Sequence, residues 1–151
     1  MPNPGPEPRF HIETHGTADS VRQILIDLRA FVEGLGSDAD TSGTIEIVMA
    51  EALNNIIEHA YAPGCEGPLW LSAQRDGGLL RVELRDTGRP LPGFKLPQTN
   101  LPDASGPLQG LPEGGFGWFL IRDLTDSLSY RRFGAQNRLT LEFWLNRAVQ
   151  P

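Results

Sequence analysis

Residues 45–61 read IEIVMAEALNNIIEHAY, and the rest of the sequence is best understood from this stretch outward. Its apolar side chains recur at helical spacing, which predicts a mostly buried helix that begins near Ser42 or Thr44. Glu51, Asn55 and His59 follow one another at i, i+4 steps and so form a polar column along that helix. Burying a carboxylate, an amide and an imidazole is costly unless each has a partner. The column therefore indicates partners from the protein, a metal or a ligand.

Composition limits the class of protein. The chain has 151 residues, 39% of them hydrophobic and 21% charged, which suits one domain with a sizeable core. A net charge of −6 argues against nucleic acid as a partner. The single Cys65 fits a reducing compartment, and neither a signal peptide nor an apolar run of the roughly 20 residues that a membrane span needs is evident. We expect a cytoplasmic protein without membrane contact, with residues 1–8 as a flexible lead-in and 9–147 as a single domain.

The remaining elements follow from periodicity and turn residues. Asp19 and Ser20 are available to cap the helix before the central one, and Gly134 marks a turn near the C-terminus. In chain order we expect strand 9–14, helix 17–35, the central helix, hairpin 69–86, a long loop, a helix after the glycines at 114–117, and hairpin 128–145. This order predicts an α/β (α+β) two-layer sandwich, with helices on one face of a mixed, mostly antiparallel sheet.

The first hairpin ends in a buried acid. Asp86 falls on the same strand face as Leu80, Val82 and Leu84, so the strand points a carboxylate toward the core. Gly88 follows at a position where backbone can come close to a ligand without an intervening side chain. Taken alone, Asp86 is more typical of a strand-end residue that binds turn amides.

A long loop rich in proline and glycine, residues 89–110, separates this hairpin from the next helix. Such a length within a compact domain is typical of a lid or a binding loop. The loop leads to Gly114, Gly115 and Gly117, and glycines at a helix N-terminus offer N–H groups and the positive dipole end to a phosphate. A turn-and-cap role explains the same glycines, and their spacing matches neither the Walker nor the dinucleotide motif.

Three motifs in this order carry a resemblance. They read Glu51-Ala52-x-x-Asn55-x-x-x-His59-Ala60-Tyr61, then Asp86-x-Gly88, then Glu113-Gly114-Gly115-Phe116-Gly117-x-Phe119-Leu120-Ile121. They resemble the ATP-binding boxes of the histidine-kinase-like ATPases, the GHKL superfamily with its Bergerat fold and ATP lid. Within it, the chain is most similar to the anti-sigma-factor serine/threonine protein kinases, over about residues 10–145. The single-domain size and the short EGGFGWFLI glycine box indicate this subfamily.

The resemblance implies roles at the phosphate end of ATP. Glu51 would act as general base on an incoming serine hydroxyl, and Asn55 would ligate Mg²⁺ through its side-chain oxygen. Gly115 and Gly117 would let the lid and the helix start wrap the phosphates. Arg122 is a candidate for the γ-phosphate by proximity, although a helix-surface charge explains it equally. His59, near a helix end, is more typical of a structural residue.

The resemblance also implies roles at the adenine end. Asp86 would accept a hydrogen bond from the adenine amino group, and Gly88 would let the backbone approach the base. Thr140, or Asn137 before it, lies near where the family places a polar residue that touches the base or a bridging water. Gln136 and Asn137 stand where the family's Gly-Thr pair is expected, which is a departure from its pattern.

The function implied is that of an ATP- and Mg²⁺-dependent serine protein kinase that is also an anti-sigma factor. It would sequester a sigma factor and phosphorylate a serine on a small anti-anti-sigma (STAS-type) antagonist, and the family implies a homodimer. Two alternatives remain open. One is a nucleotide-binding regulator that acts by sequestration without kinase activity, against which Glu51 argues because nucleotide binding alone needs no base. The other is a partner-switching kinase with a non-transcriptional target.

Overall fold

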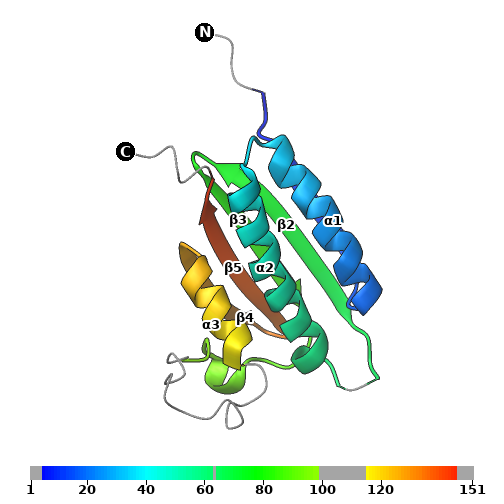
Figure 1. Ribbon diagram of the computed structural model, residues 1–151. Coiled ribbons are helices and arrows are strands. Elements are labelled where there is room, and N and C mark those ends of the chain that lie inside the picture. The colour runs from blue at the N-terminus through cyan, green and yellow to red at the C-terminus, as the bar shows by residue number, and fades with distance from the viewer. Residues whose placement is uncertain (1–4, 63, 99–114, 146–151) are drawn as a thin grey trace.

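A five-stranded sheet forms one layer of the molecule, and helices cover one of its faces (Figure 1). The computed structural model describes residues 5–62, 64–98 and 115–145. Within these ranges the strand order is β1-β2-β3-β5-β4, and all neighbouring pairs are antiparallel. The predicted two-layer sandwich is therefore confirmed, with a described sheet that is antiparallel throughout rather than mixed.

The elements follow the predicted order with shifted boundaries. The strands are β1 (Arg9–His15), β2 (Pro68–Asp76), β3 (Leu79–Asp86), β4 (Ser127–Phe133) and β5 (Gln136–Trp144). The helices are α1 (Ala18–Gly34), α2 (Ala39–Asn55) and α3 (Gly115–Leu124), joined by the π-helical turn η1 (Ile56–Ala60) and the 3₁₀ turn η2 (Pro92–Phe94). Among these helices, none has both the length and the apolar character needed to cross a bilayer.

Alternation along the strands divides the sheet into two faces. The face toward the helices is apolar, and the opposite face is polar and uncovered by the described elements (Figure 1). Side chains that are fully buried between sheet and helices include Leu71, Leu80, Val82, Leu141, Val48, Met49 and Leu53. Such burial stabilises by about 1.5–3 kcal/mol for each large apolar side chain. This shared core fixes the central helix against the middle of the sheet.

Two helix starts differ from the prediction. Thr17 caps α1 through a capping box with Ser20, so Ser20 is the third helical residue and not the cap itself. Asp38 caps α2, because its Oδ1 accepts a 2.7 Å hydrogen bond from the backbone N–H of Thr41. The central helix therefore begins at Ala39, one turn before the position that its apolar pattern indicates.

The C-terminal end of the central helix also departs from a regular α-helix. The α-helical pattern stops at Asn55, and the next residues form the π turn η1. A π turn is a single wide turn that is frequent at functional sites. Here it brings Ala60 against the loop after β3, where the Ala60 carbonyl oxygen accepts a 2.6 Å hydrogen bond from the backbone N–H of Arg89.

Candidate functional site

A cavity of about 440 Å³ lies between the end of the central helix, the loop after β3 and the β4–β5 hairpin. Most of its wall is apolar, and the polar side chains that it does contain come from separate elements. Those that matter below are Asn55, His59, Asp86, Tyr130 and Asn137, with Trp118 as an aromatic wall from α3. A concave, largely apolar space of this size with few polar groups is typical of a small-molecule site.

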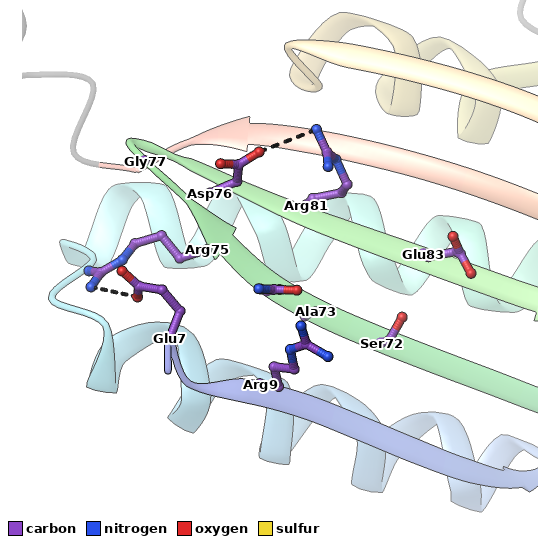
Figure 2. Close-up of a pocket in the computed structure, with 10 residues that line it drawn as sticks. Glu7, Arg9, Ser72, Ala73, Arg75, Asp76, Gly77, Arg81 and Glu83 are labelled. Atoms are coloured by element: carbon purple, nitrogen blue, oxygen red, sulfur yellow. Dashed lines mark hydrogen bonds and ion pairs between the residues drawn. The ribbon is translucent and has the colours of Figure 1, made fainter. Parts of the chain in front are cut away.

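A second, larger hollow lies beside the β2–β3 turn (Figure 2). Four of its charged side chains form two ion pairs, which Figure 2 shows: Arg75 with Glu7 at 3.1 Å and Arg81 with Asp76 at 3.6 Å. Such exposed ion pairs contribute little to stability, and the lining of this hollow is more polar than that of the first cavity. None of the residues that the sequence predicts for the site lines this hollow. The cavity at the end of the central helix is therefore the candidate site.

Asp86 lies at the floor of this cavity, at the end of β3, and is only 4% exposed. Its Oδ1 accepts two hydrogen bonds, from the Gly88 backbone N–H at 2.9 Å and from Asn137 Nδ2 at 2.8 Å. Burial raises the pKa of the Asp86 carboxyl, while these hydrogen bonds and the nearby Arg132 guanidinium lower it in part. Asp86 therefore binds a turn amide and also lines the cavity, and its role in nucleotide binding stays a prediction.

Asn137 faces Asp86 directly across the β3–β5 pair and is 5% exposed. Besides Asp86, its Nδ2 group donates to the carbonyl oxygens of Gly88 at 3.3 Å and Arg89 at 2.9 Å. One amide thus joins the last strand to the acid and to the loop that follows the acid.

The other end of that amide is held from β4. Asn137 Oδ1 accepts hydrogen bonds from the Tyr130 hydroxyl at 2.6 Å and from Arg132 Nη1 at 2.9 Å. Tyr130 also accepts from the Leu91 backbone N–H at 3.0 Å, and Arg132 donates to the Gly88 carbonyl at 2.7 Å. Neither Tyr130 nor Arg132 is predicted as a site residue from the sequence. The available signal was their place on the helix-facing side of β4, where Arg132 pairs with Asn137 and Tyr130 with Leu139.

Thr140, which the sequence also named as a nucleotide-binding candidate, does not line this cavity. On β5 the buried residues Asn137, Leu139 and Leu141 face the helices, whereas Thr140 points to the uncovered face between Glu83 and Ser129. Side chains of a strand alternate, so residues three positions apart lie on opposite faces. Of the two residues named together, only Asn137 reaches the cavity.

Glu51, Asn55 and Gly117 meet where α3 begins beside α2. A Cβ atom added to Gly117 would lie 2.8 Å from Glu51 Oε2 and 3.8 Å from Asn55 Nδ2. Asn55 lines the cavity, whereas Glu51 is not part of its wall and lies one turn earlier on α2. Gly115 is the first residue of α3, and the other predicted lid residues, 99–114, lie outside the described residues.

The side chain of Asn55 fits the predicted role in holding a cation. Its Nδ2 atom is buried and has no hydrogen-bond partner among the described residues, a costly arrangement unless a ligand completes it. An unpartnered amide can turn so that its oxygen takes the same place, and oxygen is the donor that Mg²⁺ prefers. The described residues contain no cluster of three acidic, His or Cys side chains for a metal. A cation here would take its other ligands from phosphate and water.

Packing within the protein also explains why a glycine stands at position 88, besides any approach of a ligand. A Cβ atom there would collide with the Ala60 carbonyl and lie 2.7 Å from the Ala60 Cβ. The glycine thus lets the loop after β3 pack on η1. The bond from Arg89 N–H to Ala60 reinforces this contact.

The remaining polar residues named from the sequence, His59, Arg122 and Asn54, are exposed to solvent. His59 lies on η1 and lines the cavity with an exposed imidazole, 3.7 Å from Glu58 Oε2. Arg122 donates from Nε to the Pro97 carbonyl at 2.9 Å, so it ties α3 to the loop after β3. Asn54 is exposed, as expected for a solvated amide.

Comparison with known proteins agrees with this architecture. Residues 15–143 match the family model described as the histidine kinase-like ATPase domain. The match spans most of the chain, and the chain belongs to the histidine kinase-like ATPase family.

Curated relatives and a solved structure narrow the resemblance. The chain is 30% identical to serine-protein kinase RsbW of Halalkalibacterium halodurans, over 76% of this chain and 70% of the relative. It is 25% identical to the anti-sigma F factor of Bacillus subtilis, over 93% and 96% of the two chains. The structure of the RsbU and RsbW domains of Rv1364c from Mycobacterium tuberculosis superposes with a TM-score of 0.66 at 20% identity, covering 93% of this chain. This chain spans 33% of that longer protein, and the likeness shows the shared fold.

Proposed function

We propose that the chain is an ATP- and Mg²⁺-dependent serine protein kinase that also acts as an anti-sigma factor. It sequesters a sigma factor and phosphorylates a serine on a small anti-anti-sigma antagonist of the STAS type. The observation that carries the proposal is one cavity with the fixed Asp86 carboxylate at its floor and the unpartnered Asn55 amide in its wall. The family match and the names of the relatives support it.

ATP binds in this proposal with adenine at the floor of the cavity and its phosphates toward the start of α3. Asp86 accepts a hydrogen bond from the adenine amino group through Oδ2, since both bonds that described residues make to the carboxylate use Oδ1. The backbone at Gly115 and Gly117 receives the phosphates at the N-terminus of α3. Asn55 would hold Mg²⁺, which would supply charge neutralisation at the phosphates.

Glu51 is the proposed general base, one turn before Asn55 on the same helix. It removes the proton from the serine hydroxyl while the serine oxygen forms a bond to the γ-phosphorus. The bond from that phosphorus to the bridging oxygen breaks, and its electron pair leaves with ADP. Gly117 keeps the carboxylate close to the start of α3, because any side chain at position 117 would meet Glu51 Oε2.

We also propose that residues 9–147 act as one domain, that the protein is a cytoplasmic homodimer, and that it binds neither nucleic acid nor a membrane directly. The cytoplasm is where a sigma factor would be met. The net charge of −6 is consistent with a protein partner rather than nucleic acid.

The central test is phosphoryl transfer from γ-labelled ATP to STAS-type proteins encoded in the source genome. We expect Glu51→Gln to abolish transfer while its ATP affinity stays within about twofold of the wild type, because the general base acts only in the chemical step. Glu58→Gln, a matched change at an exposed glutamate beyond Asn55, should transfer normally.

The alternatives predict different results in the same assay. Wild-type protein that binds ATP and a sigma factor without any transfer would favour a regulator that acts by sequestration. Transfer without affinity for any sigma factor would favour a non-transcriptional target. If Glu51→Gln lost ATP binding as strongly as it lost transfer, the role of general base would be contradicted.

A further inference from the structure

We infer that Asn137 is a positioning residue that fixes the orientation of the Asp86 carboxylate and thereby selects adenine over purines that carry a carbonyl at the same ring position. The inference rests on the proposed binding of ATP in the cavity and goes beyond it, because Asn137 acts through Asp86 rather than on the nucleotide.

The hydrogen bonds of Asn137 leave no capacity for a ligand. Its amide nitrogen, which has two hydrogens, faces acceptors on Asp86, Gly88 and Arg89 at 2.8, 3.3 and 2.9 Å. Its oxygen, which has two lone pairs, accepts from Tyr130 at 2.6 Å and Arg132 at 2.9 Å. Since the oxygen is held by two donors, the amide cannot turn over without losing both bonds. The side chain therefore presents its nitrogen permanently to Asp86.

The consequence for Asp86 is a carboxylate with one occupied and one available oxygen. Oδ1 accepts from Asn137 and from the Gly88 backbone N–H, which fixes the plane of the carboxylate at the cavity floor. The described residues make no hydrogen bond to Oδ2. An ionised carboxylate only accepts hydrogen bonds, so Oδ2 matches the amino group of adenine and repels the carbonyl of hypoxanthine. Sites that hydrogen-bond a substrate group discriminate strongly against an analogue without it.

The charge state of Asp86 supports the same role. Burial favours the neutral acid, and the hydrogen bond from Asn137 opposes that effect by lowering the pKa of Asp86. The other charged or titratable groups around it are Arg132 from β4, which also lowers that pKa, and Tyr130, Arg89 and His59 in the cavity wall. A protonated Asp86 could donate a hydrogen bond and would accept hypoxanthine, so the adenine preference depends on Asn137.

The test compares the affinities of the full chain for ATP and for ITP, which differ in the amino or carbonyl group of the base. Both are measured by calorimetric titration with Mg²⁺ at neutral pH. We expect Asn137→Ala to lower ATP affinity by about 10- to 100-fold, the range for losing a hydrogen bond to a charged group, while ITP affinity falls much less. Asn54→Ala removes the same amide from an exposed position and should leave both affinities unchanged.

A milder variant keeps the test valid should Asn137→Ala fold poorly. Tyr130→Phe removes one donor to the Asn137 oxygen and keeps the aromatic ring, so the ATP-to-ITP ratio should fall in the same direction by a smaller factor. Equal losses of ATP and ITP affinity in both variants, or an unchanged ratio in the folded variants, would overturn the inference and assign Asn137 a packing role. Wild-type protein that binds neither nucleotide would overturn the proposed function and the inference with it.

Discussion

Asp86 is a carboxylate that the fold keeps almost entirely away from water, yet without an ion pair at hydrogen-bond distance among the described residues. Its partners are a backbone N–H and a neutral amide, and the Arg132 guanidinium acts on it only as a nearby charge. Desolvation is the dominant influence, so the pKa of this carboxyl lies above its ordinary value. A group with this property makes folding sensitive to pH in a direction opposite to that of most paired acids.

We expect the ionisation of Asp86 to reduce the free energy of unfolding. Because its folded pKa is raised, the acid is protonated in both states below about pH 3.9, its unfolded value, and its contribution is then fully present. That contribution is lost as the pH rises through the folded pKa. The test is denaturant unfolding of the wild type and of Asp86→Asn at a series of pH values upward from about 3.9. The wild type should lose stability relative to the variant as the pH rises. A difference that stays constant with pH would contradict the raised pKa.

Sequence and structure agree best at positions where one periodicity decides the outcome. The strand face on which the Asp86 side chain lies was predicted by counting in steps of two along a strand whose end was evident. The same counting places Thr140 on the outer face, between Leu139 and Leu141, but it could not place Asn137, because the start of β5 at Gln136 is set by pairing with β3 and β4. Tyr130 and Arg132 were missed for the same reason, since their role depends on register across strands and not on local sequence.

At the scale of the element, the order of helices and strands follows from apolar periodicity and turn residues, and it was predictable. The π turn η1 was not, because the same apolar spacing fits a regular helix, and the wide turn arises where Ala60 packs on the loop after β3. The start of α2 at Ala39 depended on Asp38 as a cap, seven residues before the apolar pattern begins at Ile45.

Two glycines at element junctions should respond differently to alanine. Gly88→Ala places a methyl group against the backbone of Ala60, which has little freedom to move, so we expect a destabilisation of about 1–3 kcal/mol. Gly117→Ala meets the end of the flexible Glu51 side chain, which can turn away. We therefore expect little loss of stability but a large loss of phosphoryl transfer. Chemical denaturation and the transfer assay measure the two effects.

Gly43→Ala serves as the control for both variants. Gly43 lies within α2 with no atom within 4 Å of an added Cβ, so alanine there should stabilise by about 0.5–1 kcal/mol. Normal phosphoryl transfer in a Gly117→Ala variant would contradict the proposal that the position of the Glu51 carboxylate matters for the reaction. A Gly88→Ala variant as stable as the wild type would contradict the tight packing on η1.

At the scale of the whole molecule, the candidate site draws on the central helix, on the ends of sheet strands and on α3, so a ligand there contacts both layers of the fold. ATP with Mg²⁺ should therefore stabilise the entire domain and not one segment of it. At a ligand concentration of about 100 times Kd, linkage predicts about 2.7 kcal/mol of added stability.

Thermal unfolding with and without ATP and Mg²⁺ measures this effect. We expect a clear rise in Tm for the wild type and almost none for Asp86→Asn, whose amide nitrogen would face the adenine amino group donor to donor. Asp123→Asn, at an exposed position of α3, should behave as the wild type. An equal rise in Tm for Asp86→Asn would mean that nucleotide binds elsewhere or without contact to this acid.

The hydrogen bonds around Asn137 also determine when the two ends of the site lose their conformational entropy. At the adenine end, Asp86, Asn137 and Tyr130 already hold one another in place, so the entropy of ordering these side chains is lost during folding and not during binding. At the phosphate end, the Asn55 amide still lacks a partner among the described residues, and its ordering falls to the binding step. The base is therefore recognised by a preorganised surface, whereas the phosphates and their cation complete the surface that receives them.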